Sequence, residues 1–285
     1  MLAETPKPTA VLDMHNVERL LQRAICKTPR SNRNMFGGPI RVGSRVATPD
    51  RRNRHSCTRF VNGRRMPTTT PLDIGAVAQA LTVGRAAIVP NPSPLTYVVT
   101  ATNPQAVNTA KGRPIDQEVA LWVHDETTWA GLIPSLDLTF SALRMAVALL
   151  RVELVTLLAP VCADTSPPAW AVPALRDGHL LLFGARWQPL APLLARFPRL
   201  YVSSANRTGQ APAATASAAA AMFGPGIPVA DADSLRESDT PHTATTMLRI
   251  APSGALTHVR RGAQDQAHGA DPDLYLERLR TTELR

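Results

Sequence analysis

Lysine is almost absent from this sequence, although the chain is strongly basic. Of its 31 basic residues only three are lysines, namely Lys7, Lys27 and Lys111, and the other 28 are arginines. An isolated lysine such as Lys111 is a candidate for a role that suits a compact, mobile ammonium, the alternative being a solvated surface side chain. The use of arginine for lysine, with abundant alanine and proline, is typical of a GC-rich bacterial genome.

Cysteine and long apolar runs are also missing, which excludes several classes of protein. Cys26, Cys57 and Cys162 are isolated and odd in number, so neither a disulfide framework nor a zinc centre is predicted. His55 and Cys57 could chelate a metal, but too few candidate ligands lie nearby to predict a site. No apolar run approaches about 18 residues, and no apolar signal core begins the chain. We therefore expect a cytoplasmic protein with no membrane segment.

Positive charge is concentrated near the N-terminus. The segment 27–65 holds eleven basic residues and one acidic residue, a net +10 (11 − 1), while the whole chain carries +9. We predict that residues 1–70 form a basic, partly disordered N-terminal extension, because apolar anchors are few there. Its functional interpretation is binding of tRNA or another polyanion through the arm 27–65. The alternative is a solubilising or locally folded extension.

The sequence between residues 71 and 265 alternates between β-rich and helical runs, which predicts one α/β domain followed by a tail, 266–285. We expect strands at 86–90, 96–100, 119–123, 154–159, 180–183, 200–203, 246–250 and 256–259. We expect helices at 73–81, 104–110, 140–150, 190–195 and 212–222, and a tail helix at 272–280.

The expected helix 104–110 has clear boundary signals. Thr102 or Asn103 can cap its first turn, and Pro104 suits the first helical position. Pro114 is expected to stop it, because proline cannot continue a helix. For the helix 212–222, Pro212 is expected at the first helical position.

Two polar groups are candidates for anion binding. Lys111 and Arg113 lie two residues apart at the end of a helix, so they can converge on a phosphate or bicarbonate. Ser204 and Asn206 follow a predicted strand, and such strand ends line nucleotide pockets in open α/β sheets. The alternative for the second group is a polar turn closed by Gly209.

These two groups resemble known signatures. KGRP at 111–114 and SAN at 204–206 look like the KxRP and SxN motifs of threonylcarbamoyl-AMP synthases, the YrdC-like domain. LWVH at 121–124, FGAR at 183–186 and VRRGA at 259–263 resemble further motifs of that family, in the same order. The resemblance covers 73–264 and implies a YrdC-like single domain with a twisted mixed sheet flanked by helices.

The resemblance also implies an activity and a set of site residues. Family members condense L-threonine, bicarbonate and ATP, with Mg²⁺, into threonylcarbamoyl-adenylate and pyrophosphate for tRNA modification. The catalytic residues would be Lys111 and Arg113, and no metal ligands are expected from the protein. The ATP-binding residues would be Lys111, Arg113, Ser204, Asn206 and Arg260. The residues that bind the amino acid or carbamate would be Tyr97, His124, Arg186 and Thr245.

One segment departs from the family pattern. The family's PTDTVYGL corresponds to PSPLTYVV at 92–99, which keeps only Pro92 and Tyr97 unchanged. The polar groups expected around threonine are missing, so we predict a nucleotidyltransferase that makes threonylcarbamoyl-AMP or a related amine-derived carbamoyl-AMP. Two alternatives remain, namely a non-catalytic YrdC-like RNA-binding or regulatory protein and a carbamoyl-transfer enzyme of secondary metabolism.

Overall fold

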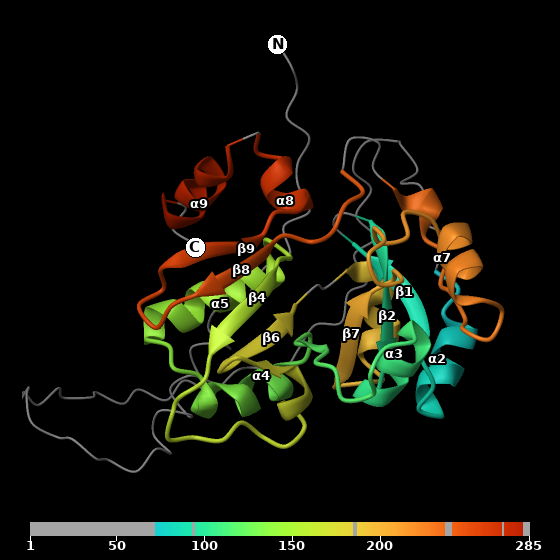
Figure 1. Ribbon diagram of the computed structural model, residues 1–285, viewed down its shortest axis with the longest axis horizontal. Helices are drawn as coiled ribbons and strands as arrows, with labels where there is room; N and C mark the ends of the chain where they lie inside the picture. Colours follow the sequence, from blue (N-terminus) through green and yellow to red (C-terminus); the bar gives the residue numbers. More distant parts are fainter. Residues whose placement is uncertain (1–71, 93–94, 185–186, 237–240, 270, 282–285) are drawn as a thin grey trace, which may run out of the picture. The chain divides into compact units, whose positions relative to one another are not determined.

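The computed structural model describes residues 72–92, 95–184, 187–236, 241–269 and 271–281, all within one compact unit. The predicted N-terminal extension 1–70 lies outside these residues. The described residues form one mixed sheet (Figure 1). Strand β3 pairs with β6 in parallel, as β4 does with β8, and the other neighbouring strands are antiparallel. The order of its strands is β1 (Ala87–Asn91), β2 (Thr96–Ala101), β7 (Leu200–Ser204), β3 (Ala120–Trp122), β6 (His179–Phe183), β4 (Thr156–Pro160), β8 (Met247–Ile250) and β9 (Leu256–Arg260), with β5 (Leu175–Arg176) beside β6.

Helices flank the sheet, and each is short. The α-helices are α2 (Gly75–Thr82), α3 (Pro104–Lys111), α4 (Glu126–Leu132), α5 (Phe140–Arg151), α6 (Ala191–Leu194), α7 (Ala216–Phe223), α8 (Ala263–Gln266) and α9 (Pro272–Thr281). Single 3-10 turns occur at Ile133–Ser135, Val172–Ala174, Gln188–Leu190 and Asp233–Leu235. None of the described helices is long and apolar enough to cross a membrane.

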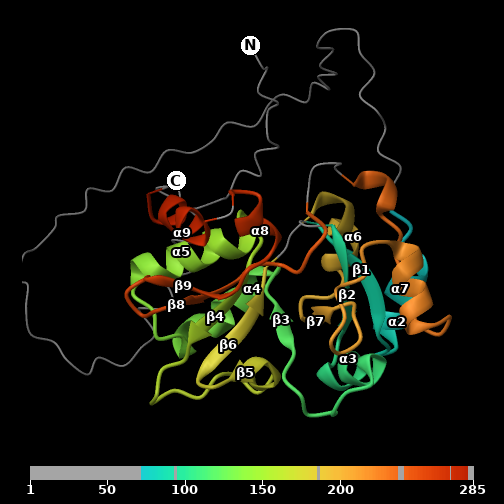
Figure 2. The ribbon, with the colours of Figure 1, turned by 45° about the horizontal axis from the view of Figure 1, so that its top comes forward.

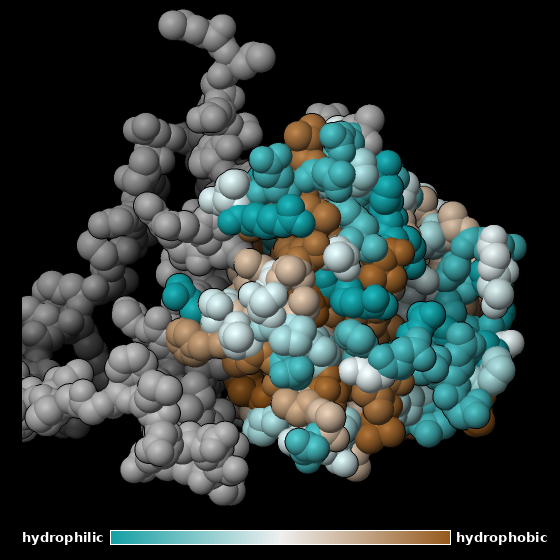
Figure 3. Space-filling view, turned by 60° about the vertical axis from the view of Figure 1, so that its left-hand side comes forward, coloured by the Kyte–Doolittle hydropathy of each residue, from teal (hydrophilic) through white to brown (hydrophobic). Residues whose placement is uncertain are grey.

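Alternation along the strands builds a core on each face of the sheet. In β2, Val99 belongs to the larger apolar cluster, together with side chains of α3, α4, α5, α7 and α9, whereas Val98 belongs to a second cluster with α2 and α6. Successive side chains of a strand point to opposite faces, so one strand serves both clusters. Figure 2 shows the two ends of the curled sheet, one with β1 and α2 and the other with β9, α8 and α9. The face of the described part seen in Figure 3 mixes hydrophilic with hydrophobic residues.

The tail helix α9 is part of the larger core. Tyr275 and Leu279 are buried in the same cluster as the sheet residues. Glu153, just after α5, accepts hydrogen bonds from the hydroxyl of Tyr275 at 3.3 Å and from Arg278 at 2.5 Å. The helix predicted at 272–280 is therefore present, and it packs on the α/β domain.

Two local predictions need correction, and one helix was not predicted. Gly112 ends α3, because it adopts a left-handed conformation (φ 63°) in which its N–H bonds back to the last turn, so the helix is over before Pro114. Thr215 caps α7, which begins at Ala216 and not near Pro212. Helix α4 was not predicted, although Asp125 accepts hydrogen bonds from the first N–H groups of that helix. The cap of α3 is Asn103, whose side chain accepts from the N–H of Ala106 at 2.8 Å.

Candidate functional site

Lys111 joins the end of α3 to the turn that follows β7. Its ammonium donates to the carbonyl of Ser204, to the carbonyl of Asn206 at 2.7 Å and to the side-chain oxygen of Asn206 at 2.8 Å. That amide oxygen also accepts from the hydroxyl of Ser204 at 2.6 Å. The two motifs singled out in the sequence, at 111–114 and 204–206, are therefore in direct contact.

The environment of Lys111 is crowded and positively charged. The residue is 7% exposed, and burial lowers the pKa of its ammonium to about 8, with Arg113 and Arg207 contributing in the same direction. Its three N–H groups match three acceptors, so the charged form is fully hydrogen-bonded. Lys111 thus holds the 204–206 turn in place. It does not line the cavity described next.

A cavity of about 190 Å³ opens on one face of the sheet, and each of the nine described strands contributes at least one residue to its wall. Its charged side chains are Arg113, Arg176 and Arg260 against the single carboxylate of Glu118. Hydroxyl and amide groups come from several strands and from the segment before β8. These polar residues are Asn91, Thr96, Gln117, Thr156, Ser203, Ser204 and Thr245.

Arg113 reaches the cavity from the loop after α3. Its Nε donates to the side-chain oxygen of Asn108 at 2.6 Å, and one terminal nitrogen donates to the carbonyl of Glu118 at 3.3 Å. Burial lowers its pKa, while Glu118 acts in the opposite direction. These two contacts fix the plane of the guanidinium and leave further N–H groups for an anion, because arginine carries five donors.

A β-bulge directs Arg260 to the same cavity. The pairing of β8 with β9 shifts between Met247 and Leu248, which pair with Arg260 and His258 respectively, so Val259 is the extra residue. The bulge places Arg260 opposite Met247, which lines the cavity. His258 lies opposite Leu248, and Leu248 belongs to the larger core. The guanidinium of Arg260 donates to the carbonyl of Thr245 at 2.8 Å. Desolvation by the surrounding protein lowers the pKa of this guanidinium.

The structure brings four of the predicted site residues together in the cavity, namely Arg113, Ser204, Thr245 and Arg260. Lys111 and Asn206 lie directly behind Ser204 and outside the lining. His124 is buried after β3, with its ring edge-on to Trp122 at 5.8 Å between centroids, and is not part of the lining. Arg186 lies outside the described residues.

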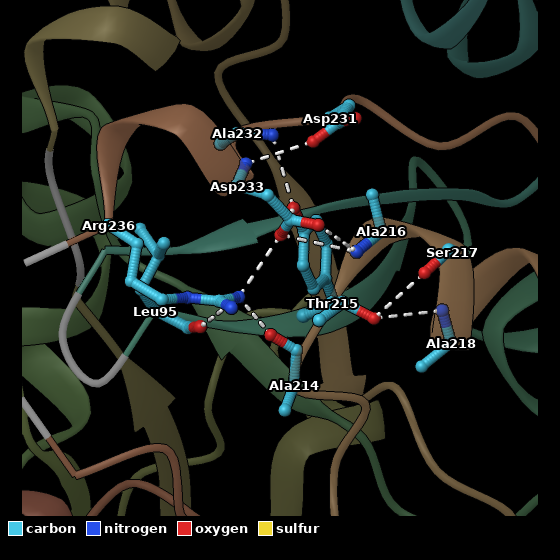
Figure 4. A network of polar contacts seen from close by, with 11 residues as sticks. Leu95, Ala214, Thr215, Ala216, Ser217, Ala218, Asp231, Ala232, Asp233 and Arg236 are labelled. Atoms are coloured by element: carbon cyan, nitrogen blue, oxygen red, sulfur yellow. Dashed lines mark hydrogen bonds and ion pairs between the residues drawn. The ribbon is translucent and has the colours of Figure 1, made fainter. Parts of the chain in front are cut away.

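Tyr97 does not lie where the sequence placed it. Its neighbours Thr96 and Val98 line the cavity, so strand alternation turns Tyr97 to the opposite face, in the larger core. There its hydroxyl donates to Asp233 at 2.8 Å. Figure 4 shows that Asp233 also accepts from Arg236 at 3.0 Å and from the first N–H of α7, that of Ala216. Tyr97 therefore holds α7 and the 3-10 turn at 233–235 on the sheet, away from the cavity.

Sequence reasoning missed several lining residues, above all Asn91. Its side-chain nitrogen donates to the hydroxyl of Thr245 at 2.7 Å, across 154 positions of the chain. Asn91 is 2% exposed, and its side-chain oxygen has no hydrogen-bond partner among the described residues. Alternation from the segment 92–99 could have signalled Thr96 as a lining residue, but nothing local distinguishes Asn91 or Thr156.

No protein-family model matches this chain, and no curated protein does either. Among solved structures, HypF in its phosphate- and nucleotide-bound form is 15% identical, with 68% of this chain and 29% of that chain covered at a TM-score of 0.50. Sua5 of P. abyssi, complexed with L-threonine, is 17% identical, with 66% and 53% covered at 0.49. YciO of E. coli is 11% identical, with 66% and 88% covered at 0.47.

This chain spans about half the length of the Sua5 structure and less than a third of HypF. At these identities the likeness is one of fold, and it rests on the superposition with HypF. The α/β fold class predicted from the sequence, a mixed sheet flanked by helices, is confirmed. By its fold this chain is similar to the part of HypF that it covers.

Proposed function

We propose that this protein is a nucleotidyltransferase that forms a carbamoyl-adenylate from ATP, bicarbonate and an amino acid or amine. The observation that carries the proposal is the meeting of Arg113, Arg260 and Ser204 in one cavity, against a turn held by Lys111. That HypF was solved with phosphate and nucleotide bound supports a phosphate-binding role for this fold.

The proposed reaction forms two bonds. The amine nitrogen bonds to the carbon of bicarbonate, water leaves, and a carbamate results. A carbamate oxygen then attacks the α-phosphorus of ATP, and the bond from that phosphorus to the bridging oxygen of pyrophosphate breaks. Negative charge develops on phosphate and carbamate oxygens, which positioned cations stabilise. Arg113 and Arg260 supply that charge in a site with one carboxylate, Glu118.

The size of the cavity supports a role in holding the reacting groups. Its volume of about 190 Å³ lies below the roughly 300–1,000 Å³ of usual ligand pockets. It suits the carbamate and the adjoining phosphate, and not a whole nucleotide. Mg²⁺ binds substrate phosphates in such reactions, so we expect it to enter with ATP and not through a ligand of the protein.

The acceptor is the least constrained part of the proposal. Neither Leu95 nor Tyr97 lines the cavity. The hydroxyl of Tyr97 donates to Asp233, and the carbonyl of Leu95 accepts from Arg236. Val98 lines the cavity with an apolar side chain. Of the described residues between 95 and 99, only Thr96 offers a polar side chain to the cavity, so we expect L-threonine to be disfavoured about ten- to a hundred-fold. We therefore propose another amino acid or amine as the preferred acceptor.

The test is ATP-dependent release of pyrophosphate, screened over amino acids and amines with bicarbonate present. The proposal expects release that requires both bicarbonate and an amine, with threonine below the best acceptor. Release that ignores bicarbonate, or no release with any amine, would contradict the activity. Threonine as the preferred acceptor at a high rate would instead identify an ordinary threonylcarbamoyl-AMP synthase.

A further inference from the structure

Asn91 lines the cavity and carries an unused hydrogen-bond acceptor. It ends β1, where its backbone pairs with Thr96 of β2, and both residues line the wall. Its side-chain nitrogen is committed to the hydroxyl of Thr245 at 2.7 Å. The side-chain oxygen has no partner among the described residues, in a side chain that is 98% buried.

An acceptor in such a place is informative about the ligand. Buried polar atoms in folded proteins are nearly always paired, and one left without a partner is costly. Rotation of the amide would pair the oxygen with the hydroxyl of Thr245 but leave the nitrogen without an acceptor, so one polar atom of Asn91 stays unpaired in either orientation. A bound molecule that donates a hydrogen bond at this point would complete the site.

The charges around the cavity restrict the kind of donor. Arg113, Arg176 and Arg260 line the cavity with one carboxylate, that of Glu118, so an anion is favoured even though Arg176 also pairs with Asp177 at 3.7 Å. A cationic ammonium is disfavoured beside three guanidinium groups, whereas a neutral N–H is not. The carboxylate of Glu118 is exposed to solvent, so its charge has little influence on which donor binds.

We infer that the side-chain oxygen of Asn91 accepts a hydrogen bond from a neutral N–H of a small anionic substrate, and that this contact determines the site's specificity. The inference rests on the proposed function in one respect, since a carbamate carries both features, a carboxylate and an adjacent neutral N–H. Asn91 thereby selects the amine after it has become a carbamate, and Thr245 is the positioning residue that orients Asn91.

A matched pair of stable ligands tests the inference without ATP. Oxamate and pyruvate are both small carboxylates of similar shape, and they differ in one group, an amide NH₂ in oxamate and a methyl in pyruvate. We expect NMR titration of the full-length protein to show oxamate binding about ten- to a hundred-fold more tightly than pyruvate.

Variants of residues in the cavity wall test whether Asn91 is the source of the preference for oxamate over pyruvate. Asn91→Leu should bring oxamate down to the affinity of pyruvate. Asn91→Asp keeps an acceptor but adds a negative charge, so both ligands should weaken while the preference for oxamate remains. Thr245→Val releases the amide, and the preference should fall to a few-fold. Val98→Ala, on the same wall and without a polar group, is the control and should leave the ratio unchanged.

The outcomes separate this inference from the proposed function. Equal binding of the two ligands, tighter binding of pyruvate, binding of neither in the millimolar range, or a preference that survives in Asn91→Leu would overturn the role of Asn91. If Asn91→Leu does not fold, as judged by circular dichroism, the ratios in Asn91→Asp and Thr245→Val decide. Pyrophosphate release is measured separately, so it can fail or succeed independently of these titrations.

Discussion

The ammonium of Lys111 and the side-chain oxygen of Asn206 lie 2.8 Å apart, although 95 positions separate the two residues in the chain. This contact ties the end of α3 to the turn after β7, and with Ser204 it supports the wall of the cavity. The contact makes Lys111 a structural support of the site, whereas the sequence predicts direct contact of Lys111 with ATP. A role of Lys111 in contact with ATP stays a prediction.

Lys111→Ala should therefore lower the free energy of unfolding. The change removes the lysine donor from the partly buried carbonyls of Ser204 and Asn206, which costs about 1–3 kcal/mol. Urea denaturation of the variant and the parent measures the difference. Arg85→Ala, which removes an exposed cation, is the control and should stay within about 0.5 kcal/mol of the parent. Equal stability of Lys111→Ala and the parent would show that these hydrogen bonds are not formed in solution.

The same lysine should titrate at an unusually low pH. The chain contains only three lysines, so selective labelling of lysine side chains gives three NMR signals. We expect the signal of Lys111 to titrate near pH 8, since burial lowers its pKa from 10.5 to about 8. Between these values the unfolded chain binds more protons, so this group's contribution to the free energy of unfolding rises with pH. Lys111→Met should lack that rise, and three lysines titrating together near 10.5 would contradict the burial.

Arg113→Ala and Arg260→Ala should each reduce the rate of pyrophosphate release by about a hundred- to a thousand-fold, because each removes a cation aimed at developing negative charge. Lysine at either position should restore only part of the rate, since it lacks the planar fork. Arg85→Ala again serves as the control. A rate unchanged in both alanine variants would exclude the cavity as the place where ATP reacts.

The basic arm is expected to govern binding to polyanions. Replacing Arg51, Arg52, Arg54, Arg64 and Arg65 by glutamine in the full chain should weaken binding to tRNA. The slope of log K against log salt should fall by about 0.7–0.9 for each lost phosphate contact. Small-substrate turnover should change little, because the rest of the chain is nearly neutral. Filter binding over a salt series measures the slope, and an unchanged slope would assign the arm another role.

Much of the fold follows from local patterns. The strands at 96–101 and 200–204 and the helices at 104–111 and 140–151 lie within a residue of their predicted bounds. Asn103 was one of two expected caps, and its choice over Thr102 depends on geometry, since the hydroxyl of Thr102 donates to Leu81 instead. The start of α7 is predicted too early, because Thr215 caps this helix and Pro212 lies before it.

The candidate site shows where local patterns stop. The sequence by itself determined that Arg113, Ser204 and Arg260 are candidates for an anion site, because their motifs occur in order and at strand or helix ends. Only the tertiary structure decided which side chains share a cavity. The bulge at Val259 turns Arg260 to the cavity, and the register of β2 turns Tyr97 away. Asn91 meets Thr245 across 154 positions. These are long-range pairings set by strand register, and a shift of one residue reverses every side chain, so no local pattern contains them.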